Sequence, residues 1–352
     1  MTTKIAFTSS SDPLDATVQP VWNTIAGHEP DHLLLLGDTV YMDYFLGIGK
    51  NPSLGKPSEY SVEKFSKELH RRYQSQWEVF RQSDLWKLPL LEIHGIWDDH
   101  DFAWNNSFGD SGSNTSKDMS KDNDAVSCNK QRVSRKAMQD FFHALQNRAE
   151  TYPSDPYADA NSWAKIPLDQ PMFCTSSQNQ IVKLAEGVSL FLSDGRSFRT
   201  SQTSTHSTAL GKEQIDSIGD LLGSGSILIL ACGSTISGSG ESLDNYEDYK
   251  NLMDTITKRK GRVLACSGDI HKAAWRKHGL PVMPNDVSVG MPEFLYEAVA
   301  SGAARPLVGT IEGCFGLLAI EVEHIQIDLY GDGSKLKKNL RVIRKDWTVV
   351  SK

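Results

Sequence analysis

Several short apolar runs of this 352-residue chain end directly in aspartate. In residues 90–106, LLEIHGIWDDHDFAWNN, a strand-like run ends at Trp97 and the tetrad DDHD of residues 98–101 follows at once. Carboxylates crowded at the end of a buried strand repel one another and lose hydration, so a cation is the least costly way to stabilise them. The alternative for this stretch alone is a polar strand end whose aspartates cap a turn.

Three more apolar runs lead into acidic groups in the same way. The runs are residues 32–36, 188–193 and 262–267, and the groups that follow them are Asp38, Asp194 with Arg196, and Asp269 with His271. Carboxylate oxygens and imidazole nitrogens at convergent positions are ligands of hard or borderline divalent metals. Two such ions, about 3.5–4 Å apart, can share one bridging carboxylate and activate a water molecule. Each acidic group alone is weak evidence for a metal site, but the repetition of such groups after several apolar runs indicates one.

The order of these runs predicts an α/β fold. Residues 4–8 form the expected first strand, a helix follows with Pro20 near its first turn, and residues 32–36 form the next strand. This β-α-β opening implies parallel strands and a right-handed crossover. It brings residues 9–12 and Asp38 to the carboxyl edge of the sheet, where α/β proteins bind their ligands. Other predicted elements are helices at residues 59–83, 131–147, 212–222 and 245–258 and a buried strand at residues 227–231.

Three other segments lack a helical pattern. Residues 107–129 are polar, and a loop of this length is either an active-site lid or disordered. Residues 152–174 are expected to be irregular with short strands at their end. Residues 272–306, which contain several prolines and glycines, are expected to be irregular throughout.

The last part of the chain alternates between apolar and polar residues. Residues 315–330 and 340–350 therefore predict antiparallel strands around a turn at residues 331–333. The lysines and arginines between residues 335 and 345 are interpreted as a solvated edge that prevents strand pairing, with an anion-binding role as the alternative. Because no linker is evident, we expect one catalytic domain over residues 1–352.

Composition excludes several classes of function. A hydrophobic content of 39% and a charged content of 23% are those of a globular protein, and a net charge of −7 without a basic tail argues against nucleic-acid binding. No apolar stretch has membrane-spanning length, and the beginning of the sequence has no signal-peptide pattern. The five cysteines are scattered, without a CxxC pair, so we expect a reduced, cytoplasmic protein. The sequence indicates no oligomeric state.

Four motifs resemble those of the PhoD-like phosphatases, a branch of the calcineurin-like metallophosphoesterases. They are GDTVYMD at residues 37–43, WDDHDFAWNN at 97–106, DGRSFR at 194–199 and SGDIH at 267–271, and their order and spacing agree with that family over about residues 4–330. The resemblance implies an α/β/β/α sandwich, in which two mixed sheets lie face to face with helices outside and a dinuclear metal site lies at one edge.

The same resemblance implies roles for individual residues. His100 would contact the transferring phosphoryl group or protonate the leaving oxygen. Arg196 would bind phosphate or orient an acid, and Asp98 is the third candidate catalytic residue. The implied metal ligands are Asp38, which would bridge the two ions, and Tyr41, Asp99, Asn105, Asp269 and His271.

One position departs from the family pattern. PhoD-like phosphatases commonly have a cysteine in the first loop that, with a tyrosinate, supports a ferric ion, and Ser10 stands at this position here. A serine hydroxyl is a poorer ligand for Fe³⁺ than a thiolate. The two ions could therefore be Ca, Mg, Mn, Zn or Fe. Ser10 is a further candidate metal-site residue, and the alternative is that it caps a turn away from the site.

The motifs together predict a metal-dependent phosphomonoesterase or phosphodiesterase that acts on a phosphate-ester substrate through a dinuclear centre and an activated water. The alternatives are a non-catalytic or altered-specificity binding protein on the same fold and a hydrolase of another ester, such as a lactone or a sulfate. Secreted relatives carry a signal peptide and a further N-terminal domain, which this sequence lacks, so phosphate scavenging outside the cell is not expected.

Overall fold

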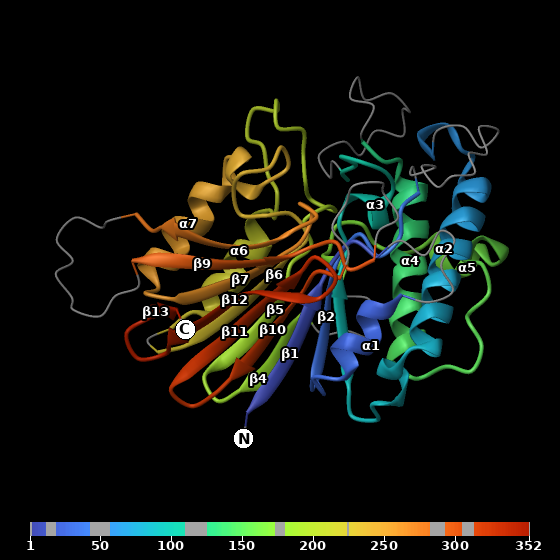
Figure 1. Cartoon of the computed structure of the whole chain (residues 1–352). Coiled ribbons are helices and arrows are strands. Elements are labelled where there is room, and N and C mark those ends of the chain that lie inside the picture. The colour runs from blue at the N-terminus through green and yellow to red at the C-terminus, as the bar shows by residue number, and fades with distance from the viewer. Residues whose placement is uncertain are drawn as a thin grey trace.

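The computed structural model shows two β-sheets between two groups of helices (Figure 1). Helices α1, α2 and α4 lie beside one sheet, and α6 and α7 lie beside the other. The predicted arrangement of two mixed sheets with flanking helices is thus confirmed. The structure describes residues 2–11, 19–42, 57–109, 125–172, 180–223, 225–281, 293–304 and 313–351.

The seven-stranded sheet joins the two ends of the sequence. Its order is β13-β12-β11-β10-β1-β2-β3, in which β1, β2 and β3 are parallel and β10 to β13 are antiparallel. The predicted C-terminal antiparallel strands are therefore confirmed, and they extend the sheet that the N-terminal strands begin. The strands are β1 Thr3–Thr8, β2 His32–Leu36, β3 Glu92–Ile96, β10 Phe315–Ile320, β11 His324–Gly331, β12 Lys335–Ile343 and β13 Thr348–Ser351.

The basic cluster between residues 335 and 345 lies mainly on β12. Its partner β13 pairs only with Leu340 to Ile343, so no strand among the described residues pairs with the first half of β12 on that side. The side chains of Lys335 to Lys338 are exposed there. This segment pairs with β11 on its other side, and exposed lysines at such a strand edge discourage pairing with another chain, as the sequence predicts.

The six-stranded sheet has the order β4-β5-β6-β7-β9-β8. Strands β5, β6, β7 and β9 are parallel, and β4 and β8 are antiparallel edge strands. The strands are β4 Ile181–Ala185, β5 Val188–Leu192, β6 Ile227–Cys232, β7 Arg262–Ser267, β8 Ala273–Gly279 and β9 Phe294–Ala300.

The structure contradicts one prediction of irregular structure and modifies another. Residues 272–306 contain β8 and β9, which pair with each other from Ala273 to Gly279 against Phe294 to Ala300. Three of the prolines and glycines that suggested a loop, Pro284, Gly290 and Pro292, lie in residues 282–292, outside the described residues. In the segment 152–174, the described residues up to 172 are irregular apart from short helices, and they contain no strand. The end of this segment, residues 173–174, lies outside the described residues.

The long helices agree closely with the sequence pattern. The buried stripe of α2, which includes Phe65, Leu69, Tyr73 and Trp77, packs with α4 through aromatic pairs such as Tyr73 with Phe141. None of the described helices is both long and apolar enough to cross a membrane. The helices are α1 Pro20–Ala26, α2 Val62–Gln82, α3 Asp99–Phe102, α4 Cys128–Gln146, α5 Ala160–Trp163, α6 Lys212–Leu221 and α7 Asp248–Lys258, with short 3-10 turns at Pro57–Glu59, Asp84–Lys87, Pro156–Ala158 and Leu243–Asn245.

Several predicted features lie outside the described residues. They are most of the expected lid (residues 110–124), the end of the first loop from residue 12, the last residue of GDTVYMD, and Cys174.

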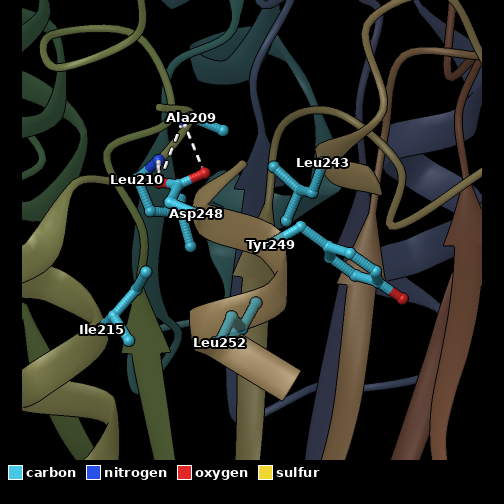
Figure 2. A pocket seen from close by; sticks show the side chains of 7 residues that line it. All are labelled: Ala209, Leu210, Ile215, Leu243, Asp248, Tyr249 and Leu252. Atoms are coloured by element: carbon cyan, nitrogen blue, oxygen red, sulfur yellow. Dashed lines mark hydrogen bonds between the residues drawn. The ribbon is translucent and has the colours of Figure 1, made fainter. Parts of the chain in front are cut away.

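A buried aspartate joins α7 to the loop before α6. Asp248, the first residue of α7, accepts backbone hydrogen bonds from Ala209, Leu210 and Gly211, each at 3.0 Å. Figure 2 shows this carboxylate beside a small, mainly apolar recess. The recess is lined by Ala209, Leu210, Ile215, Leu243, Asp248, Tyr249 and Leu252, none of which is a predicted site residue. Asp248 therefore orders the loop before α6.

The packing around β10 leads to a stability prediction. A Cβ at Gly316 would lie 2.1 Å from Phe7 Cζ, and Phe7 is fully buried. We expect Gly316→Ala to lower the free energy of unfolding by about 1–3 kcal/mol, the usual cost of overpacking a core, in urea denaturation. Gly279→Ala on β8 is the matched control, because nothing lies within 4 Å of its Cβ position. Equal stability of both variants would contradict the tight packing at Gly316.

Candidate metal centre

The loops at the carboxyl ends of the strands are bonded to one another across the two sheets. Ser10 N–H, after β1, donates to Gly37 O after β2 at 3.2 Å. Gly302 N–H, after β9 of the other sheet, donates to Ser9 O at 3.1 Å. The first loop is therefore fixed between the two sheets, at the edge where the sequence places the acidic groups.

Glycines allow these loops to approach closely. Gly37 has a φ of +87°, and a Cβ there would lie 2.5 Å from Asp98 N. A Cβ at Gly233, after β6, would lie 2.7 Å from Asp98 Oδ1, and one at Gly268 would lie 2.7 Å from Ser9 Oγ. Because any larger residue would separate the loops, glycine at these positions keeps the two sheets in contact at the site.

Asp38, Asp99 and His100 form a buried group of potential metal ligands. One ligand atom of each lies within 4.8 Å of the others. Asp38 has a φ of 53°, a left-handed conformation that aspartate tolerates better than most residues. Tyr41 Oη donates to Asp38 Oδ2 at 3.1 Å, and its ring lies 4.1 Å from the His100 ring, centroid to centroid. The structure thus brings the loops after β2 and β3 together around these side chains.

The donor set fits a metal ion. Asp38 Oδ1 is buried and has no hydrogen-bond partner within the described protein. Burial raises the pKa of Asp38 well above its ordinary value, and the charge of Asp99 raises it further while His100 opposes this. A cation at Asp38 Oδ1 would supply the missing interaction and favour the ionised carboxylate.

The pKa of Asp99 is shifted in the opposite direction from that of Asp38. Burial alone would raise its pKa, but the charges of His100 and Arg196 and a hydrogen bond from Asn106 N–H outweigh burial, so the pKa lies well below its ordinary value. The Asn106 N–H to Asp99 Oδ2 distance is 2.6 Å. The preceding Asn105, predicted to lie near the metals, is exposed at its position in this loop. Asp99 is therefore an anionic ligand candidate over the whole physiological pH range.

Asp101 fixes the backbone of this stretch. It forms a capping box with Asp98 at the start of α3, in which Asp101 Oδ2 accepts from Asp98 N–H at 3.1 Å. Its Oδ1 accepts from Thr39 N–H at 2.8 Å, which joins α3 to the loop after β2. Burial raises the pKa of Asp101 to about 7, although these hydrogen bonds oppose it. Asp101 therefore positions Asp99 and His100.

Arg196 connects the acidic groups of both sheets. Arg196 Nε donates to Asp98 Oδ1 at 2.6 Å, and Nη2 lies 2.5 Å from Glu241 Oε2 and 3.7 Å from Asp99 Oδ1. Burial lowers the pKa of Arg196, but the charges of Asp98, Glu241 and Asp99 raise it well above its ordinary value. The guanidinium is thus a permanent charge that orients Asp98.

Glu241 is a site residue that the sequence analysis missed. It follows the Gly/Ser-rich loop after β6 and contacts both Arg196 and Arg199, the latter at 3.3 Å from Nη1. Burial raises its pKa to about 7, with Arg196 opposing. The available signal was a single acid after a run of small residues at the end of a buried strand.

Asp194 holds the loop that carries Arg196. Its Oδ1 accepts from Ser197 N–H at 2.9 Å and from Trp97 Nε1 at 2.7 Å. Since Trp97 follows β3 of the other sheet, this contact is a further bond between the sheets at the site edge. Asp194 of the DGR motif thus fixes the loop from which the Arg196 side chain reaches the acids.

Asp269 and His271 follow β7 with φ values of 70° and 48°. His271 N–H donates to Ser301 Oγ at 3.0 Å, Ser301 Oγ lies 3.0 Å from Ser10 Oγ, and Ser10 Oγ lies 3.5 Å from Asp38 Oδ2. Ser10 is therefore at the site, between the loops of Asp38 and His271. Burial raises the pKa of Asp269 to about 6, with further contributions from Glu241 and Asp99.

The structure thus places the predicted site residues in two neighbouring groups. Among the described residues, the close group of three ligand atoms contains Asp38, Asp99 and His100 but neither Asp269 nor His271. The electrostatic influence of Asp99 on Asp269, and the chain of contacts through Ser10 and Ser301, connect the two parts.

Known proteins resemble this chain in fold and not in sequence. No protein-family model and no curated protein matches its sequence. A solved structure described as "Structure of PhoD" is similar with a TM-score of 0.65 and 13% identity, over 99% of this chain and 71% of that chain. A second solved structure aligns over 94% of this chain and 99% of its own length, with 10% identity and a TM-score of only 0.40. The chain therefore has a PhoD-like fold.

Proposed function

We propose that this chain is a metal-dependent phosphoric ester hydrolase, either a phosphomonoesterase or a phosphodiesterase, with a dinuclear metal centre. The observation that most directly supports this proposal is the buried group of Asp38, Asp99 and His100 at the carboxyl edge of a PhoD-like fold. The unpartnered Asp38 Oδ1 and the raised pKa values of Asp98 and Asp269, both about 6, support the need for cations there.

Two metal ions would supply positive charge to the phosphoryl oxygens and an activated water as nucleophile. Asp38 is the proposed bridging ligand, because it lies between Asp99 on one side and the contacts through Ser10 toward His271 on the other. The other proposed ligands are Tyr41, Asp99, Asn105, Asp269 and His271.

The protein's own residues orient the substrate and move protons. His100 lies in the first turn after β3, where the capping box of Asp98 and Asp101 fixes its backbone. Its imidazole could donate a proton to the leaving ester oxygen. Arg196 already contacts Asp98, Asp99 and Glu241, so we assign it the role of orienting these acids and limiting their repulsion.

Metal analysis and a change at Asp38 test the centre. We expect about two ions per chain, loss of hydrolysis of p-nitrophenyl phosphate and bis-p-nitrophenyl phosphate after chelation, and reduced occupancy of both ions in Asp38→Asn. Asp84→Asn is the matched control, because Asp84 contacts Lys87 on an exposed turn. Full hydrolysis by the chelated protein would overturn the proposal, and two tightly bound ions in Asp38→Asn would show that another residue bridges.

A change at His100 separates proton transfer from metal binding. We expect His100→Ala to lower kcat by about 10²–10⁴, the usual contribution of an acid-base group, with nearly unchanged metal content. The control is His143→Ala, because His143 is exposed on the last turn of α4. If metal content falls together with kcat, His100 is instead a ligand.

A change at Ser10 tests the choice of metal. Because Ser10 Oγ lies 3.5 Å from Asp38 Oδ2, Ser10→Cys would place a soft, ionisable ligand next to the proposed bridging carboxylate. We expect Ser10→Cys to raise iron uptake relative to the native protein, which should lack strong visible colour. The measurements are metal analysis and a visible spectrum. An intensely coloured native protein with bound iron would contradict the expected preference for other ions.

A further inference from the structure

A second group of potential ligands lies at the amino ends of β2 and β3. In the parallel pairing of these strands, His32 is opposite Glu92, and Leu34 is opposite His94. Because side chains alternate along a strand, His32, Glu92 and His94 share one face of the sheet. Asp38 and Asp99 follow the opposite ends of the same strands, about 20 Å away at the rise of an extended chain. The two groups are therefore separate.

The three nearest polar atoms of this group form a nearly regular triangle. His32 Nδ1 lies 3.3 Å from His94 Nε2, and Glu92 Oε2 lies 3.6 Å from the former and 3.5 Å from the latter. Tetrahedral zinc has bonds of about 2.0–2.2 Å to nitrogen and oxygen, so its ligand atoms lie about 3.3–3.6 Å apart. The triangle has the size that three ligands of one zinc ion require.

We propose that His32, Glu92 and His94 form a second metal site that binds Zn²⁺. Two imidazoles and one carboxylate are typical ligands of a borderline divalent metal, whereas Ca²⁺ and Mg²⁺ prefer oxygen ligands. The Glu92 side chain is 63% exposed, while His32 and His94 are 11% and 10% exposed. Solvent therefore reaches the site from the Glu92 side, and a water molecule can take the fourth position.

Protonation does not oppose this binding. Burial, with a smaller contribution from His32, lowers the pKa of His94 to about 4. Burial also lowers the pKa of His32, although Glu92 and Asp31 oppose this effect. Both imidazoles are therefore neutral at neutral pH, which is the form that binds metals.

The bound ion would connect two neighbouring strands at one end of the sheet. Because His32 belongs to β2 and both other ligands belong to β3, the ion would join them at their first residues. A ligand that binds only the folded chain stabilises it by mass action. The ion would thus stabilise the folded chain, and the proposal is independent of hydrolysis at Asp38.

The contrasting explanation is a hydrogen bond between two neutral rings. One ring would donate from His32 Nδ1 or His94 Nε2 and the other would accept, with Glu92 beside them. This arrangement needs no metal and predicts no zinc uptake at these residues. Direct measurement of bound zinc separates the two explanations.

The test measures zinc bound per chain after equilibrium dialysis of the metal-free protein against buffered Zn²⁺. An Asp38→Asn background reduces binding at the other centre. We expect His94→Gln to lose one zinc per chain and Glu92→Gln to weaken that zinc at least about tenfold. His206→Gln is the matched control, since His206 forms a surface pair with Glu247 at 3.4 Å and belongs to neither ligand group. We expect it to bind zinc like its background.

Equal zinc binding by Glu92→Gln, His94→Gln and the control would overturn the proposal. Should the buried His94→Gln fail to fold, Glu92→Gln decides alone, because Glu92 is exposed. Hydrolysis of p-nitrophenyl phosphate by His94→Gln, with Asp38 intact, should equal that of the wild type. A wild type that hydrolyses no ester but loses one zinc with His94→Gln would contradict the proposed function and support the second site.

Discussion

The ion pair between Arg196 and Asp98 is the interaction on which the site edge depends. Both side chains are buried, and they come from different sheets, Asp98 after β3 and Arg196 after β5. Removing one member of a buried pair leaves an uncompensated charge, at a typical cost of about 3–5 kcal/mol. The pair therefore fixes how the carboxyl ends of the two sheets meet. The loops that carry Asp38 and Asp269 take their relative positions from this contact region.

Charge balance explains why so many acids can share this edge. Arg196 and Arg199 both form ion pairs with Glu241, and they lie among several buried carboxylates. Burial raises the pKa of most of these carboxylates, whereas Asp99 is kept ionised by His100 and Arg196. Two arginines thus compensate part of the negative charge, and the remainder favours the binding of cations.

The sequence predicts well what depends on local pattern. The strands at residues 32–36 and 262–267 have the predicted bounds, because each apolar run stops at a glycine. Strand β8 was missed because Ala273 to Gly279 lacks alternation and owes its extended form to pairing with β9. Glu241 and Ser301 reach the site through long-range packing, and the His32, Glu92 and His94 group depends on the register of β2 against β3. Long-range packing and strand register cannot be predicted from the local pattern of a single sequence.

The position of β1 between β2 and β10 has a consequence for biosynthesis. Thr3 pairs with Ile320, so one edge of β1 has no strand partner until almost the whole chain has left the ribosome. At usual translation rates of about 5–20 residues per second, that delay is roughly 15–60 s. During this time β1 presents an open strand edge, which is prone to pairing with other chains. The nascent chain is therefore expected to need chaperone protection until β10 emerges.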